Sequence, residues 1–141
     1  MVYLGAMIKT ILVGTDFTPG ADEAQAFAVD LARQVGAQVH ILHVIEPIGK
    51  PAEDPDIEEF HAQLNEQAMN KLSERVSQIT DVKVEYSVVL GHRPLVIAEK
   101  AHRLGADCIV MGMRSDHGTS AVGSGVVQRA DVPIILVPPK R

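Results

Sequence analysis

Five short apolar runs, rich in valine and isoleucine, are spaced along the chain. They cover residues 8–14, 38–45, 83–90, 107–112 and 132–137. Most of them are continuously apolar rather than alternating, which is typical of strands buried on both faces of a parallel sheet. The pattern therefore predicts five strands, each short and largely enclosed.

The segments between these runs carry apolar residues at helical spacing. Two of the predicted helices have marked ends. Thr18 can cap the first helix, with Pro19 at its first position and Gly36 after its last turn, and Pro94 and Gly105 mark the third in the same way. The other two helices are predicted from apolar spacing, over residues 57–79 and within about 121–131.

Strands and helices thus alternate four times, which predicts one doubly wound α/β domain of the Rossmann-like kind, with a five-stranded parallel sheet and right-handed crossovers. In such sheets ligands bind beyond the carboxyl ends of the strands, where the strand order reverses. The proline-rich stretch 46–56 follows the second strand. We expect it to be either a lid over this edge or a surface excursion without a role.

Composition narrows the class of protein. The formal net charge of −5 argues against a non-specific nucleic-acid surface. No apolar run approaches the roughly 20 residues of a membrane-spanning helix. The first residues make a poor signal peptide, and Met7 could be an alternative start. The single cysteine, Cys108, excludes an internal disulfide and suits a reducing cytosol, so we expect a cytoplasmic protein without a membrane partner.

The segment after the fourth apolar run holds the strongest candidate for binding chemistry. Residues 111–125 contain four of the eleven glycines, three serines and a threonine. Such a loop can wrap its backbone N–H groups around an anion, or it can be a plain connection. If the first and fourth strands are neighbours, this loop and Asp16 face one crevice, with Arg114 as a nearby cation.

Other kinds of site find little support. The sequence G-x-x-x-x-G-K-[ST] is absent, so a P-loop is excluded. Ser115, Asp116 and His117 are consecutive, and neighbours in sequence rarely form a catalytic triad. His40 and His43 should face opposite sides of one strand, and no cluster of metal ligands emerges. We therefore predict no catalytic residues and no metal site.

Three stretches together resemble the universal stress protein family over residues 7–138. They are "KTILVGTDFTPGADEAQAFAVDLARQVGAQVHILHVIE", "VLGHRPLVIAEKAHRLGADCIVMGMRS" and "ADVPIILVP". The resemblance implies the strand order 3-2-1-4-5. It also implies a non-catalytic, stress-linked role exercised as a dimer, with the protein partner unknown.

Many members of this family bind ATP, with magnesium, through the pattern Gly, two residues, Gly, nine residues, then Gly followed by Ser or Thr. Here Gly112 fills the first place, Ser115 replaces the second glycine, and Gly125 is followed by Val126. The loop is thus rich in the right residues but off register. Two pairs could supply the missing phosphate contacts, namely Gly118 with Thr119 and Gly123 with Ser124.

The remaining contacts of the family transfer more directly. The resemblance places Asp16 near the adenine and ribose, Val44 at the adenine edge, and Met111 with Gly112 along the same crevice. Gly14 and Thr15 precede Asp16 as further candidates, and the contact at Gly14 is weakened because some members have proline or alanine there. Asp16 could instead be a turn or helix-capping carboxylate, and Val44 and Met111 could be plain crevice wall.

Two alternatives to a nucleotide-binding dimer stay open. One is an interaction dimer whose crevice binds nothing, and the other is an ATP-cleaving enzyme of the same broad α/β group. The family precedent places the dimer contact at the last strand, 132–137. An apolar edge strand bounded by Pro133 and Pro138 suits closed pairing with an identical strand.

Overall fold

The computed structural model describes residues 8–49, 54–113 and 121–140, in which strands and helices alternate as the apolar pattern predicts. The strands are β1 (Thr10–Gly14), β2 (Gln38–Ile45), β3 (Val84–Leu90), β4 (Cys108–Gly112) and β5 (Ile134–Val137). The helices are α1 (Pro19–Val35), α2 (Pro55–Ser77), α3 (Arg93–Leu104) and α4 (Ala121–Arg129). None of these helices is long and apolar enough to cross a membrane.

The strands form one parallel sheet in the order β3-β2-β1-β4-β5, which confirms the predicted α/β architecture and the order implied by the family resemblance. The central strand β1 pairs with β2 on one side and with β4 on the other. Its carboxyl end is therefore the point at which the strand order reverses, and ligands favour this position in doubly wound sheets.

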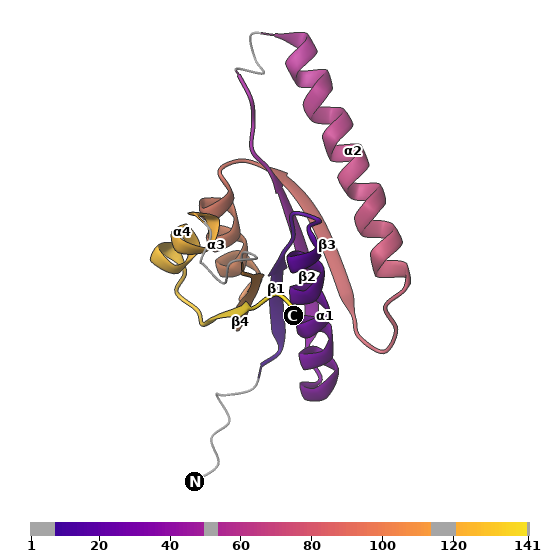
Figure 1. The fold of residues 1–141 in the computed structure, drawn as a ribbon, viewed down its shortest axis with the longest axis vertical. Coiled ribbons are helices and arrows are strands. Elements are labelled where there is room, and N and C mark those ends of the chain that lie inside the picture. The colour runs from indigo at the N-terminus through magenta and orange to yellow at the C-terminus, as the bar shows by residue number, and fades with distance from the viewer. Residues whose placement is uncertain (1–7, 50–53, 114–120, 141) are drawn as a thin grey trace.

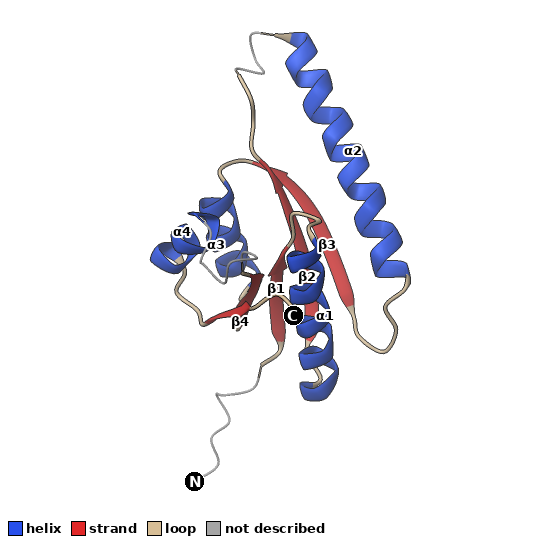
Figure 2. Ribbon diagram, viewed as in Figure 1, coloured by secondary structure: helices blue, strands red, loops and turns tan. Residues whose placement is uncertain are grey.

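Helices cover both faces of the sheet, with α1 and α2 on one side and α3 and α4 on the other (Figures 1 and 2). Each face has its own core because successive side chains of a strand point to opposite faces. On β1, Ile11 and Val13 join the core under α1 and α2, whereas Leu12 joins the core under α3 and α4. All three side chains are fully buried.

The residues predicted to cap α1 do so in the structure. The Thr18 hydroxyl caps α1 by accepting a hydrogen bond from the Ala21 N–H, and Gly36 ends the helix in the left-handed conformation at φ 76°. At the start of α3 the cap comes from elsewhere in the chain, because the Arg93 N–H donates to Glu46 Oε1 at 3.1 Å. A carboxylate here also complements the helix dipole.

Helix α2 begins beyond the end of the sheet, so the apolar stripe expected over 57–79 is only partly buried (Figure 1). Phe60 remains 44% exposed, whereas the neighbouring His61 is buried and its Nε2 accepts the Ile48 N–H at 3.1 Å. This bond ties the chain after β2 to α2. Part of the stretch that was expected to form a lid, residues 50–53, lies outside the described residues.

Candidate functional site

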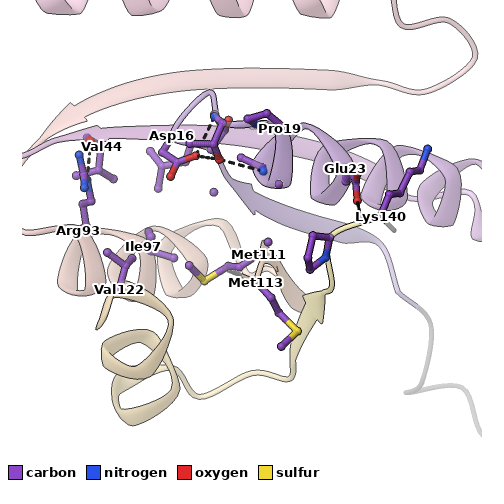
Figure 3. A pocket seen from close by; sticks show the side chains of 18 residues that line it. Asp16, Pro19, Glu23, Val44, Arg93, Ile97, Met111, Met113, Val122 and Lys140 are labelled. Carbon is purple, nitrogen blue, oxygen red and sulfur yellow. Dashed lines mark hydrogen bonds between the residues drawn. The ribbon is translucent and has the colours of Figure 1, made fainter. Parts of the chain in front are cut away.

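A cavity of about 630 Å³ opens at the carboxyl ends of β1, β2 and β4 (Figure 3). The starts of α1 and α3, residue Val122 of α4 and the segment after β5 complete its wall. The cavity therefore lies where the strand order reverses, which is where ligands bind in doubly wound sheets. Its size falls within the range of about 300–1,000 Å³ that is typical of small-molecule sites.

Six of the residues singled out from the sequence lie together in this wall. They are Gly14, Thr15, Asp16, Val44, Met111 and Gly112. Val44 and Met111 are 4% and 7% exposed, so they belong to both the core and the crevice wall.

The predicted phosphate-loop residues lie apart from these six. Gly123 and Ser124 fall within the first turns of α4, directly after Val122 in the wall, but do not themselves line the cavity. Ser115, Gly118 and Thr119 lie outside the described residues, as does Arg114.

The turn between β1 and α1 holds Asp16 at the mouth of the cavity. Asp16 Oδ1 accepts hydrogen bonds from both the backbone N–H and the hydroxyl of Thr18, so the carboxylate braces the turn and also lines the cavity. Thr15 Oγ1 accepts the Phe17 N–H at 3.1 Å. Phe17 adopts φ 64°, a left-handed conformation that is rare for a bulky side chain, so the surrounding contacts must hold this turn.

His43 supports the same turn from the other face of the sheet. Its Nδ1–H donates to the Thr15 carbonyl at 2.8 Å, and its ring lies against Phe17 with the centroids 4.5 Å apart. Burial lowers the pKa of His43, which favours the neutral ring with its proton on Nδ1. The Asp16 turn is thus fixed by hydrogen bonds from α1 and from β2.

Gly125, the glycine that falls nearest to the phosphate pattern of the family, has a packing role. A Cβ at this position would lie 2.6 Å from Pro94 Cβ and 2.7 Å from Pro94 Cγ. Glycine therefore allows α4 to approach the start of α3 closely. This contact supplies a reason for a glycine at 125 that does not involve phosphate.

Three charged residues of the described wall, Glu23, Arg93 and Lys140, were not predicted from the sequence. The Arg93 side chain reaches across the end of β2, where its Nε donates to the Val44 carbonyl at 3.3 Å. Lys140 follows β5, and its backbone N–H donates to Glu23 Oε2 at 2.8 Å, which brings the end of the chain against α1 (Figure 3). Arg93 and Lys140 follow β3 and β5, so the segments after all five strands, rather than after the first, second and fourth, point to these two, whereas Glu23 lies within α1.

The arrangement is suited to binding. An apolar floor of strand ends and helix side chains carries a few fixed polar groups, with Arg93 at one end, Asp16 near the middle and Lys140 at the other end (Figure 3). Within residues 8–49, 54–113 and 121–140, no three His, Cys, Asp or Glu side chains are placed to hold a metal ion.

Comparisons with known proteins agree with this architecture. The family model described as the universal stress protein family matches residues 7–138. A universal stress protein of Thermus aquaticus is 34% identical over 140 residues, covering 93% of this chain and 99% of that protein. The solved structure of UspA from Lactobacillus plantarum superposes with a TM-score of 0.78 at 25% identity, covering 94% of this chain and 99% of that one.

A universal stress protein from Archaeoglobus fulgidus, solved in complex with dAMP, shares the fold at 24% identity and a TM-score of 0.64, covering 92% of this chain and 98% of that one. The matched length, the sheet order and the crevice at the ends of β1 and β4 all point the same way. The chain belongs to the universal stress protein family.

Proposed function

We propose that the 630 Å³ cavity binds an adenine nucleotide, with ATP and magnesium as the first ligand to test. The observation that carries the proposal is the convergence of Asp16, Val44, Met111 and Gly112 on one cavity at the reversal of strand order. The dAMP complex of the Archaeoglobus fulgidus protein supports the class of ligand. The adenine would lie beside Val44 and Asp16, and Asp16 is available to accept a ribose hydroxyl.

The phosphates would extend toward Gly112 and the start of α4. A helix start favours anions because its first N–H groups lack partners within the helix. Val122 already lies in the cavity wall, so a phosphate near it would be close to the first turn of α4. Ser124 is exposed in the same part of the helix, and its hydroxyl is the candidate for a further contact. The first turn of α4 would then take the place of the family's contact from a glycine followed by Ser or Thr, because Gly125 packs on Pro94.

The chain would act by binding rather than by turnover. None of the described wall residues is a histidine or cysteine, and the one lysine in the wall, Lys140, belongs to the segment after the last strand rather than to a phosphate loop. Phosphoryl transfer depends on clamping cations and an oriented nucleophile. We therefore expect ATP hydrolysis to stay at background. Sustained multiple turnover that is abolished by Asp16→Ala would contradict this.

We further propose that two copies pair through β5. This strand lies at the edge of the sheet, its four residues are all partly exposed, and Pro133 and Pro138 flank it. An apolar edge of limited length suits closed two-fold pairing, because prolines lack the N–H that would extend it.

A thermal unfolding series with ATP and magnesium tests the nucleotide proposal. Ligand at 100 times its dissociation constant adds about 2.7 kcal/mol to the free energy of unfolding. For a domain of this size that raises the melting temperature by roughly 5–10 °C. The absence of any shift at millimolar ATP would favour an interaction dimer that works without nucleotide.

A further inference from the structure

A second cavity, of about 260 Å³, lies against α2 on the opposite face of the sheet from the proposed nucleotide site. On β2, His43 and Ile45 face this cavity, while Leu42 and Val44 face the larger one. Its wall consists of Phe17, His43, Ile45, Glu46, Leu64, Gln67, Ala68, Lys71 and Arg93.

Two cations in this wall lack carboxylate partners within the described parts of the chain. The Lys71 ammonium lies 4.9 Å from the centre of the Phe17 ring and forms no ion pair there. The guanidinium of Arg93 has one hydrogen bond to a described residue, from Nε to the Val44 carbonyl. Arg75, which also lies over the Phe17 ring, differs because Asp22 neutralises it.

The one carboxylate of the wall is already engaged. Glu46 Oε1 accepts the Arg93 N–H at 3.1 Å and lies 3.6 Å from His92 Nδ1. The described residues of the lining therefore carry two positive charges and one negative charge, a net charge of +1. His43 adds no charge when neutral, and burial together with the nearby Arg93 and Lys71 charges lowers its pKa.

The rest of the wall is apolar or aromatic. Ile45, Leu64 and Ala68 provide aliphatic surface, and Phe17 and His43 provide two rings in contact. A net charge of +1 is balanced by a monoanion, whereas a phosphate dianion would leave an excess negative charge beside Glu46. Apolar surface at the same place favours an anion with a flat apolar body over a bare inorganic ion.

We propose that this second cavity binds a small organic carboxylate, with its carboxylate between Lys71 and Arg93 and its apolar body against Phe17, Leu64 and Ala68. Arg93 can hold a carboxylate through its terminal amino groups, which suit that geometry. The two cavities share Arg93 in their walls and lie on opposite faces of the sheet, whereas Lys71 lines only the smaller one.

Titration of the full chain with sodium benzoate, followed by amide chemical shifts, tests the proposal. We expect saturable shifts centred on Phe17, His43, Gln67 and Lys71, and weaker binding of inorganic phosphate. Lys71→Met keeps the side-chain length but removes the charge, and it should weaken benzoate binding about tenfold or more. Ala68→Leu should also weaken binding by filling the cavity, provided that its circular dichroism shows a folded chain.

The matched control is Lys83→Met, which removes the charge of a lysine that is 68% exposed and pairs with Glu85. This variant should bind benzoate like the wild type. The proposal is overturned if benzoate shows no saturation by about 20 mM, if Lys71→Met binds it unchanged, or if phosphate binds as tightly. ATP binding by Lys71→Met is measured in parallel. A variant that loses benzoate binding but keeps ATP binding is affected only at the smaller cavity, so the two proposals can fail independently.

Discussion

Gly112 at the end of β4 and Gly20 in the first turn of α1 are in direct backbone contact. A Cβ on residue 112 would lie 2.6 Å from the Gly20 carbonyl oxygen and 2.8 Å from its carbonyl carbon. The start of α1 thus rests on the end of β4 without an intervening side chain. This contact brings the Asp16 turn and the end of β4 to the same cavity.

Gly112→Ala should destabilise the fold, because the new methyl group meets backbone rather than a movable side chain. Overpacking of this kind costs typically about 1–3 kcal/mol. Gly14→Ala is the matched control, since its Cβ would make only an ordinary contact, 3.6 Å from Ile97 Cδ1. Denaturant unfolding of both variants measures the difference. Equal stability of the two would show that the β4–α1 contact has been misjudged.

The start of α4 offers a pair of neighbours with different roles. Gly125→Ala should lower the free energy of unfolding by about 1–3 kcal/mol without nucleotide, because its methyl group meets Pro94. Ser124→Ala changes an exposed side chain, so it should leave stability almost unchanged and weaken only ATP binding. Unfolding and ATP titrations on both variants separate packing from phosphate contact. A stable Gly125→Ala protein that has lost ATP binding would reverse these assignments.

Two histidines of β2, the buried His40 and the partly buried His43, should make stability depend on pH. Burial lowers the pKa of His40 and of His43 from the ordinary value of 6.5, and the Lys100 charge adds to the effect at His40. Below pH 6.5 the unfolded chain therefore binds more protons than the folded one. The free energy of unfolding should fall as the pH drops from 6.5 toward the lowered values, by up to about 1.4 kcal/mol per pH unit for each histidine.

Urea unfolding at pH 7 and pH 5.5 measures this dependence. His43→Gln removes one of the two rings with a lowered pKa and should flatten the decline. An equally steep decline in His43→Gln and in the wild type would exclude His43 as a source of the effect.

The assembly prediction concerns the edge strand β5. Ile135→Lys places a charge at the centre of the strand, so it should shift the homodimer toward monomer or make the protein insoluble. Val127→Lys is the control, because Val127 is an apolar residue that is 55% exposed and belongs to α4 rather than to β5. Sedimentation at micromolar concentration distinguishes the species. A monomeric wild type would exclude the dimer, and a tight dimer of Ile135→Lys would place the contact elsewhere.

The fold could be predicted from the sequence because local signals and burial agree along most of the chain. The continuous apolar runs form strands. Thr18 caps the start of α1, and Gly36 and Gly105 end α1 and α3, all at the positions predicted. Phe60 differs because α2 begins beyond the sheet, where helical spacing alone does not guarantee burial.

The residues of the site were harder to predict from the sequence than the fold. The loop after the first strand led to Asp16 and the family resemblance to Met111, but Arg93 enters the wall through the length and direction of its side chain, which no periodicity reveals. The tight contact between Gly125 and Pro94 depends on how two helices cross, whereas the sequence shows Gly125 only at the third glycine of the family pattern, followed by Val126 in place of Ser or Thr.

Isothermal titration calorimetry with ATP and magnesium tests nucleotide binding in the larger cavity most directly. We expect saturable binding at one site per chain, weakened about tenfold or more by Asp16→Ala and less by Asp16→Asn, which keeps an oxygen for the Thr18 N–H. Lys83→Met should bind like the wild type. The absence of saturable binding at millimolar ATP, or unchanged affinity in Asp16→Ala, would contradict a nucleotide site at the ends of β1 and β4.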